Sequence, residues 1–585
     1  MRSVWVVASC AFALSCGQPT TKQHVEHPPA QTQKGSRTIT VIGTNDLHGA
    51  IDRLPLFGGF LSNVRAAREA DGGAVLLLDA GDMFQGTLES NLAEGADVVK
   101  AYNQLGYTAV AVGNHEFDFG PEGPAAVAKS IEDDPRGALK QRVAEAKFPF
   151  LVANIDDAKT GERIKWKNMP PSMMVESAGT MIGIIGAATE STPYTTMPAN
   201  FLGLKMAPTA AAITKEARAL RAKGAQIIIV VAHIGSACKD TTNPNDISSC
   251  NKDEEVFKVI SDLPKGLVDV WIGGHTHAAI AQRISDVAVI ESFSSGRAFG
   301  RVDLRVTGTH VSGVTIYQPT LLCDLDKDGN PEPVAQCKPD PYEGHPVTAD
   351  AEVQKLVDAA VVHAGKLRDE KLGIALTGIM TKSYSLESAE GNFFTDLMLA
   401  ARPEAQVALT NGGGLRADIP AGDLTYGRLY EAMPFDNRFA LIDLKGKHIR
   451  RLITTNIQRG SGIYSWGGVS AKARCKAGLL DVEIKIGGKP LADDATYKLV
   501  TSDFLASGGD ISAIGRLKLP EGSIQMTDVI IRDAIADVLR KEAKKKGKVD
   551  PLQYFSAKNK RLDYEGERPV LCQGAKPTRT SEEPD

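Results

Sequence analysis

Five stretches of this sequence end in residues that can bind metals or move protons. Each is an apolar run that stops abruptly at aspartate, asparagine or histidine: Ile39–Gly49, Ala74–Asp82, Tyr107–Asp118, Ala225–Gly235 and Leu267–His277. The polar residues delivered in this way are Asp46, His48, Asp82, Asn114, His115, Asp118, His233, His275 and His277. One such run is most simply a strand followed by a polar turn, but five with the same order indicate a shared site.

The chemistry of this set is that of a metal centre. Carboxylate, amide and imidazole groups without thiolate favour a dinuclear site for divalent Mn, Zn, Fe or Co over a structural zinc site. Glu116 is expected to be structural rather than catalytic. His277 is the ligand that could instead lie in the outer shell.

The elements that must position these residues are strands alternating with helices. Further strands are expected at Pro149–Ile155 and Met181–Ala187, and Pro208–Lys223 has a helical pattern with Ala211, Leu220 and Ala222 on one face. Strands that alternate with helices predict an α/β-sandwich domain. Open α/β sheets bind ligands at the carboxyl ends of their strands, where the polar residues stand.

The order and spacing of the five blocks resemble the signature of calcineurin-like metallophosphoesterases. They resemble most the secreted 5′-nucleotidase family, which includes UDP-sugar hydrolases and 2′,3′-cyclic-nucleotide phosphodiesterases. The resemblance implies two metal sites: Asp46, His48 and His277 for one metal, and Asn114, His233 and His275 for the other, with Asp82 bridging. It also implies that His115 is catalytic without binding metal, oriented by Asp118. A water activated by two metals would attack a phosphate ester, and His115 would act on the leaving group.

The second half of the chain resembles the substrate-binding C-terminal domain of the same family. Asn411 to Arg416 looks like its glycine turn, with Asn411, Gly413 and Arg416 expected at the substrate. Phe435 and Phe504 would stack on the two faces of a base, and Asp510 would bind ribose hydroxyls. Glycines let the backbone approach an anion closely. Arginine can donate two parallel hydrogen bonds to a phosphate, and aromatic rings stack on a flat base. Taken singly, each phenylalanine would be a core residue and the glycines a turn.

One departure from the family concerns phosphate binding. The family usually carries an arginine just before a Glu-Ser-x-x-Gly-Asn stretch, but here Glu387 follows Ser383-Tyr384-Ser385-Leu386, and the nearest cation is Lys382. The preference among monoester, diphosphate and cyclic diester therefore stays open. An arginine placed at Ser385 or Leu386 is expected to tighten phosphate binding.

The 585 residues exceed what one core needs, so two large domains are expected. Thr348–Glu370 has the pattern of a single helix between them. The predicted organisation is a signal peptide (1–16), a polar tether (17–36), a metallophosphoesterase domain (37–344), a linker helix (345–372), an α+β substrate-binding domain (373–546) and a tail (547–585).

The N-terminus predicts export. Arg2 precedes the apolar run Val4–Leu14, which is too short to span a bilayer but suits a signal peptide. The residues before Cys16 resemble a bacterial lipobox, which implies a lipid on Cys16; the alternative is an ordinary secretory signal. We expect a periplasmic or outer-membrane lipoprotein that meets the membrane only through this anchor.

Export permits disulfides, and six of the eight cysteines remain to form them. Proximity favours Cys238 with Cys250 and Cys323 with Cys337, leaving Cys475 with Cys572, although six cysteines allow 15 connectivities. Asp324, Asp326 and Asp328 have two alternative interpretations, a solvated acidic turn or a weak calcium site.

The net charge of −4 shows no excess of positive charge that would attract a phosphate backbone, which disfavours a nucleic acid polymer as partner. The sequence thus predicts an exported enzyme that hydrolyses nucleotide phosphate esters. Alternatives are a UDP-sugar hydrolase, a cyclic-nucleotide phosphodiesterase, or a surface lipoprotein that captures nucleotides without hydrolysis.

Overall fold

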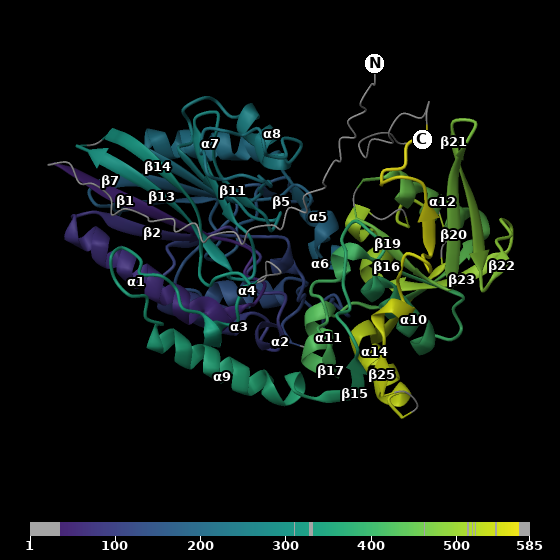
Figure 1. The fold of residues 1–585 in the computed structure, drawn as a ribbon. Helices are drawn as coiled ribbons and strands as arrows, with labels where there is room; N and C mark the ends of the chain where they lie inside the picture. The colour runs from purple at the N-terminus through teal and green to yellow at the C-terminus, as the bar shows by residue number, and fades with distance from the viewer. Residues whose placement is uncertain are drawn as a thin grey trace, which may run out of the picture.

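Two bodies joined by one long helix make up the fold (Figure 1). The computed structural model describes residues 35–123, 125–308, 310–326, 331–460, 462–511, 514–517, 519–520, 522–544 and 547–572. The predicted signal peptide, Cys16 and most of the tether lie outside this part. The joining helix α9 (Ala351–Arg368) falls within the predicted Thr348–Glu370.

The N-terminal body is built on two six-stranded sheets packed face to face. The first, in the order β14-β13-β1-β2-β3-β4, consists of β1 (Ser36–Thr44), β2 (Ala74–Asp79), β3 (Ala109–Ala111), β4 (Phe150–Leu151), β13 (Ala298–Thr307) and β14 (His310–Leu321). The second, in the order β11-β12-β10-β9-β7-β6, consists of β6 (Ser172–Ser177), β7 (Thr180–Ala188), β9 (Ile227–His233), β10 (Val270–Ile272), β11 (Ala279–Ile284) and β12 (Val287–Ser292). β-Branched residues fill the space between the sheets, which explains their continuous apolar runs.

Helices cover both outer faces and complete an α/β sandwich. The first sheet is covered by α1 (Leu54–Ala70), α3 (Ala96–Leu105), α4 (Gly137–Glu145) and part of α9. The second is covered by α7 (Thr209–Ala222) and α8 (Glu255–Asp262). The expected face of α7 is wrong except at Leu220: Ile213 and Ala217 are buried, whereas Ala211 and Ala222 are exposed. The helix buries positions spaced three or four apart, as its 3.6-residue turn requires.

The register of the central strands brings the site together. β1, β2, β3 and β4 run parallel in the first sheet, and β7, β9, β10 and β12 run parallel in the second. The carboxyl ends of the parallel strands in each sheet therefore lie along one edge.

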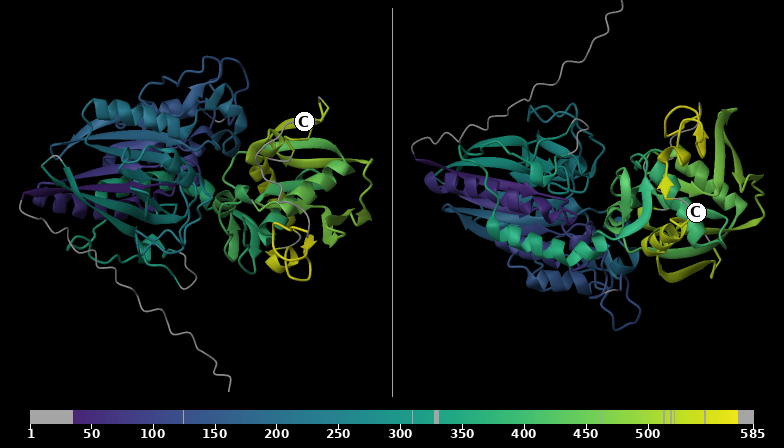
Figure 2. Two further views of the ribbon diagram at one scale, coloured as in Figure 1. Left: turned by 90° about the horizontal axis from the view of Figure 1, so that it is seen from above. Right: turned by 60° about the horizontal axis from the view of Figure 1, so that its bottom comes forward.

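The C-terminal body is an α+β domain around a five-stranded sheet of order β19-β16-β23-β18-β24. Its strands are β16 (Val407–Asn411), β18 (Arg438–Lys445), β19 (Tyr464–Gly467), β23 (Thr496–Ser502) and β24 (Ile524–Ile530). Helices α10 (Ala389–Ala401), α11 (Tyr426–Ala432) and α14 (Ile531–Glu542) pack on one face. The other face packs on α12 (Gly446–Gln458) and on the sheet β22 (Lys489–Pro490), β21 (Leu479–Ile486), β20 (Val469–Lys476) and β26 (Leu562–Tyr564). Figure 2 shows the two bodies meeting over a narrow contact.

The segment expected to be a tail is structured as far as residue 572. β25 (Lys548–Val549) pairs with β15 (Lys371–Leu376), and β26 pairs with β20. β25 and β26 are short strands that complete the edges of two sheets. Because they lack the longer apolar pattern of a buried strand, the sequence did not predict them. The predicted helix Asp528–Lys541 begins later, at Ile531, because its first residues belong to β24.

All three predicted disulfides are confirmed: Cys238–Cys250, Cys323–Cys337 and Cys475–Cys572. Among the described residues, no helix combines the length and the apolar character that crossing a bilayer requires.

Candidate metal and substrate site

The metal-ligand candidates lie on strained turns just after the strands. Positive φ angles between 49° and 81° are found at Asp46, His48, Asp82, His275 and His277. Such backbone is uncommon outside glycine and costs on the order of 1–3 kcal/mol per residue. Hydrogen bonds between neighbouring turns hold it, since the Asp46 N–H donates to Gly81 O and the His48 N–H to Asp82 O, both at 2.9 Å. The strain turns side chains from separate strands toward one point.

Six of these side chains gather in two clusters. Asp46, His48 and His277 make one, and Asp82, His233 and His275 make the other; within each, the ligand atoms lie within 4.8 Å of one another. Asp82 Oδ2 lies 2.9 Å from His233 Nε2 and 3.9 Å from His48 Nε2. Asp82 thus reaches both clusters, and so does Asp46, whose Oδ1 lies 3.9 Å from His233 Nε2.

Hydrogen bonds to the outer nitrogens prepare two of the imidazoles to bind a cation. His48 Nδ1 lies 2.8 Å from Gln85 O, and His233 Nδ1 lies 2.9 Å from Ala80 O. A carbonyl only accepts, so each Nδ1 carries the proton and each Nε2 presents a lone pair. The buried atoms His233 Nε2 and Asn114 Oδ1 have no hydrogen-bond donor. Buried acceptors without donors fit a divalent cation.

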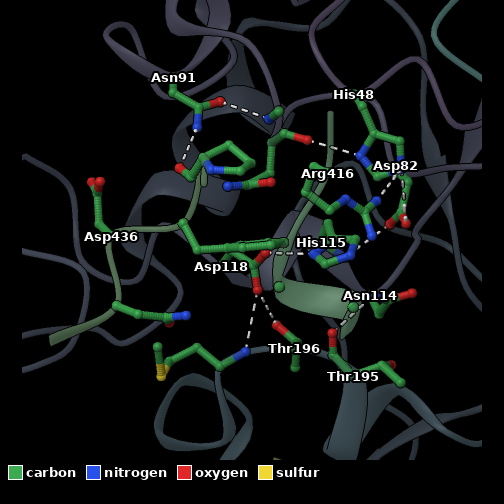
Figure 3. A pocket seen from close by; sticks show the side chains of 18 of the residues that line it. His48, Asp82, Asn91, Asn114, His115, Asp118, Thr195, Thr196, Arg416 and Asp436 are labelled. Atoms are coloured by element: carbon green, nitrogen blue, oxygen red, sulfur yellow. Dashed lines mark hydrogen bonds and ion pairs between the residues drawn. The ribbon is translucent and has the colours of Figure 1, made fainter. Parts of the chain in front are cut away.

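His115 belongs to neither cluster in the described part of the chain. Its Nδ1 lies 2.5 Å from Asp118 Oδ2, and Asp118 Oδ1 accepts from Thr196 Oγ1 at 2.8 Å (Figure 3). Its backbone N–H donates to Asp82 Oδ1 at 2.8 Å. Burial disfavours the imidazolium, but the carboxylates of Asp118 and Asp82 outweigh it and raise the pKa of His115. Because Asp118 engages Nδ1, Nε2 is the nitrogen of His115 that can act on a bound molecule.

Buried carboxylates behind the ligands hold the turns in place. Glu116 accepts the N–H groups of Asp82, Met83 and Gly113 at 2.7–2.9 Å, in keeping with the expected structural role. Glu291 accepts from Ser236 N and from Thr276 Oγ1, on the turns after β9 and β10. Burial, with a smaller contribution from Asp82 or Asp46, raises the pKa of Glu116 to about 7 and that of Glu291 to about 8.

Close packing explains the glycine before Asn114. A Cβ at Gly113 would lie 2.2 Å from Asp82 Oδ1, so only glycine fits there. Sequence reasoning missed Glu291, because a glutamate at the end of β12 carries no local signal of what it holds.

The C-terminal domain reaches into the same site. Arg416 Nη2 lies 3.3 Å from His48 Nε2, and the Phe435 ring lies 5.5 Å from that of His115. The Arg416 guanidinium also lies over the Phe435 ring at 5.8 Å. Figure 3 shows Arg416 beside His48, Asp82 and His115.

A cleft of about 1380 Å³ runs between the two domains. Its lining includes nearly all the residues singled out in the sequence: His48, Asp82, Asn114, His115, Asp118, His275, His277, Asn411, Gly413, Arg416, Phe435, Phe504 and Asp510. Asp46 and His233 are fully buried beneath it. The lining also contains Lys382, Tyr384 and Asn437, which sequence reasoning did not select.

Two predictions concern residues outside this cleft. Asp328 lies outside the described residues, and Asp324 and Asp326 join no metal-binding cluster among those described.

Of the described residues, Ser385 and Leu386 are not part of the cleft lining, whereas Tyr384 is. The expectation that an arginine at Ser385 or Leu386 would tighten phosphate binding stays a prediction. Lys382 and Tyr384 are the residues of this segment that line the cleft.

Comparison with known proteins agrees with this architecture. The profile of the calcineurin-like phosphoesterases matches residues 39–279, and that of the 5′-nucleotidase C-terminal domain matches residues 364–515. Protein UshA of Yersinia enterocolitica is 27% identical over 511 residues, covering 81% of this chain and 86% of that protein. The chain belongs to the 5′-nucleotidase family.

Other members of the 5′-nucleotidase family extend the comparison. The trifunctional nucleotide phosphoesterase YfkN of Bacillus subtilis is 29% identical over 82% of this chain, but the chain spans only 32% of that protein's length. A solved 5′-nucleotidase precursor from Thermus thermophilus has a TM-score of 0.69 at 24% identity, covering 90% of this chain and 99% of that chain. That likeness concerns the fold alone.

Proposed function

We propose that this member of the 5′-nucleotidase family hydrolyses nucleotide phosphate esters with two divalent metal ions. One observation carries the proposal: two clusters of metal-binding side chains, a carboxylate-held histidine, an arginine and two phenylalanines meet in one cleft. The clusters and the histidine belong to the N-terminal domain, and the arginine and phenylalanines to the C-terminal domain.

Each group in the cleft has a role that its surroundings support. Asp46, His48 and His277 would hold one metal, and Asn114, His233 and His275 the other, with Asp82 between them. Bound there, the ions would supply Lewis acidity to the phosphoryl oxygens and a nucleophile at neutral pH. His115, oriented by Asp118, protonates or stabilises the leaving alkoxide. Arg416 binds the phosphoryl oxygens beside His48.

The nucleoside end is assigned to the C-terminal domain. Phe435 and Phe504 line the cleft and offer flat faces for a base. Asn411 and Asp510 line it beside the glycine turn (Gly412–Gly414), where ribose hydroxyls would find an amide and a carboxylate. A protein that only captures nucleotides needs neither the His115–Asp118 pair nor the metal clusters, so hydrolysis is the better reading.

Steady-state kinetics with AMP and with glycerol phosphate test the proposal, with Mn²⁺, Zn²⁺ or Co²⁺ added. Stacking contributes roughly 1–3 kcal/mol per base, so Phe435→Ala or Phe504→Ala should raise KM for AMP by about 5- to 150-fold. The KM for glycerol phosphate, which has no base, should barely change. Phosphate release should depend on the metal for both substrates.

The ratio of the two KM values decides the outcome. Equal shifts for AMP and glycerol phosphate in the phenylalanine variants would mean that the rings are packing residues, and the nucleotide assignment would fall. AMP binding without metal-dependent phosphate release would favour the capture protein instead.

The proposed location is the periplasm or outer membrane, with a lipid on Cys16. Three disulfides within the described chain support an oxidising compartment. Wild-type protein should label with fatty acid and partition into detergent, and Cys16→Ser should lose both properties while the control Cys10→Ser keeps them. Wild-type protein found only in the soluble periplasmic fraction would contradict the anchor.

A further inference from the structure

The lining of the cleft is poor in positive charge. Among its described residues, lysine and arginine are represented by Lys382 and Arg416, and Arg416 already lies at the metal clusters. Beyond the clusters and the His115–Asp118 pair, the lining contains six carboxyl groups: Glu94, Glu122, Glu254, Glu431, Asp436 and Asp510. A phosphate held away from the metals would therefore find few cations and many carboxyl groups.

Tyr384 occupies the part of the cleft next to the glycine turn. It is 55% exposed, and a Cβ built on Gly413 would lie 3.6 Å from its ring carbon Cε2. A Cβ built on Gly462 would lie 3.3 Å from the same Cε2 and 3.5 Å from the hydroxyl oxygen. The Ile463 N–H donates to the Tyr384 carbonyl at 2.8 Å, which fixes the segment. The ring thus lies close to both glycines, and the Tyr384 backbone is tied to Ile463.

The surroundings of the hydroxyl are those of a neutral donor. Partial burial, together with the carboxylates of Asp510 and Glu254, raises the pKa of Tyr384, so the phenol stays protonated at neutral pH. Asp510 itself lies 3.7 Å from Arg459 Nη2. Tyr384 therefore lies close both to the glycine turn and to Asp510, the carboxylate assigned to the ribose.

We propose that Tyr384 is a specificity-determining residue that favours nucleoside monophosphates over nucleoside diphosphates and their sugar esters. The inference rests on the proposed function. A monophosphate has its single phosphoryl group at the metals and Arg416, and a sugar follows it, for which a phenol and a carboxylate are suitable partners. A diphosphate brings a second anion to this junction, where Arg459 is already paired with Asp510 and the described lining offers Lys382 against six carboxyl groups, so an anion is poorly compensated.

Kinetic constants for AMP, ADP and UDP-glucose, with glycerol phosphate as the substrate without nucleoside, test this inference. Wild-type protein should show a kcat/KM for AMP at least about 10-fold above that for ADP. Hydrogen bonds to charged groups are the strong ones, so Tyr384→Arg should shift the ADP-to-AMP ratio toward ADP by about 10- to 100-fold, through KM. Tyr384→Phe removes one neutral hydrogen bond and should raise KM for AMP by about 2- to 10-fold, with glycerol phosphate unaffected.

Leu386→Arg is the matched control. It adds the same charge two residues further on, at a side chain that is 54% exposed and not part of the described lining, so the ADP-to-AMP ratio should stay at the wild-type value. Equal use of ADP and AMP by the wild type, or the same ratio in both arginine variants, would overturn the role of Tyr384 and leave the proposed function standing. Metal-dependent cleavage of glycerol phosphate with no nucleotide cleaved would instead remove the proposed function, and this inference with it.

Discussion

His115→Ala is expected to slow AMP hydrolysis by about 10²- to 10⁴-fold, the usual scale of general acid catalysis. Nε2 of His115 faces the cleft while Nδ1 is held by Asp118, and His115 lies outside both clusters. The metal content of the variant should therefore match the wild type. Turnover with saturating AMP and metal analysis of the same preparations provide the measurement.

Asp118→Asn serves as the companion variant for this test. It keeps the shape of the side chain but removes the charge that orients the imidazole, so its rate should fall between those of the wild type and His115→Ala, again with full metal content. Loss of metal from His115→Ala would make this histidine a ligand and overturn its assignment.

Metal stoichiometry should separate the two clusters. Asp82 is proposed to bridge the two metals and Asp46 to hold one, so Asp82→Ala should lose both metal ions and Asp46→Ala one of two. Lewis acidity is worth several kcal/mol of transition-state stabilisation, so both variants should lose at least about 10²- to 10⁴-fold in kcat. Elemental analysis after dialysis, combined with the rate of AMP hydrolysis, gives both quantities.

The exposed aspartate at the end of α8 offers a control of the same residue type. Asp262→Ala should keep two metals and full activity, because Asp262 is exposed and belongs to neither cluster. Two metals retained in Asp82→Ala would rule out its position between the sites.

The sequence singles out the residues that the structure gathers at the candidate metal site, because most of them follow a buried strand. A buried strand rarely ends in aspartate or histidine without a partner, so His48, His233 and His275 were informative where they stood. The positive φ angles of their turns could not be predicted from the sequence, because contacts with neighbouring turns impose them.

Prediction was weaker where position depends on contacts distant in the chain. Tyr384, rather than Ser385 or Leu386, lines the cleft because its backbone is tied to Ile463. β26 has three residues and an ordinary composition, and only its pairing with β20 makes it a strand. The domain limits at 344 and 373 remain predictions.

The late position of β26 has a consequence for the order in which the protein matures. Synthesis runs from the N-terminus, and all twelve strands of the two N-terminal sheets are present once Leu321 has emerged. The sheet β22-β21-β20-β26 stays incomplete until Tyr564, and Cys475 waits for Cys572. Domains generally fold as units, the N-terminal one first. The N-terminal sheets can thus form before the C-terminal domain is complete, and a truncation that removes β26 and Cys572 should destabilise that domain while the metal-binding clusters of the N-terminal domain remain.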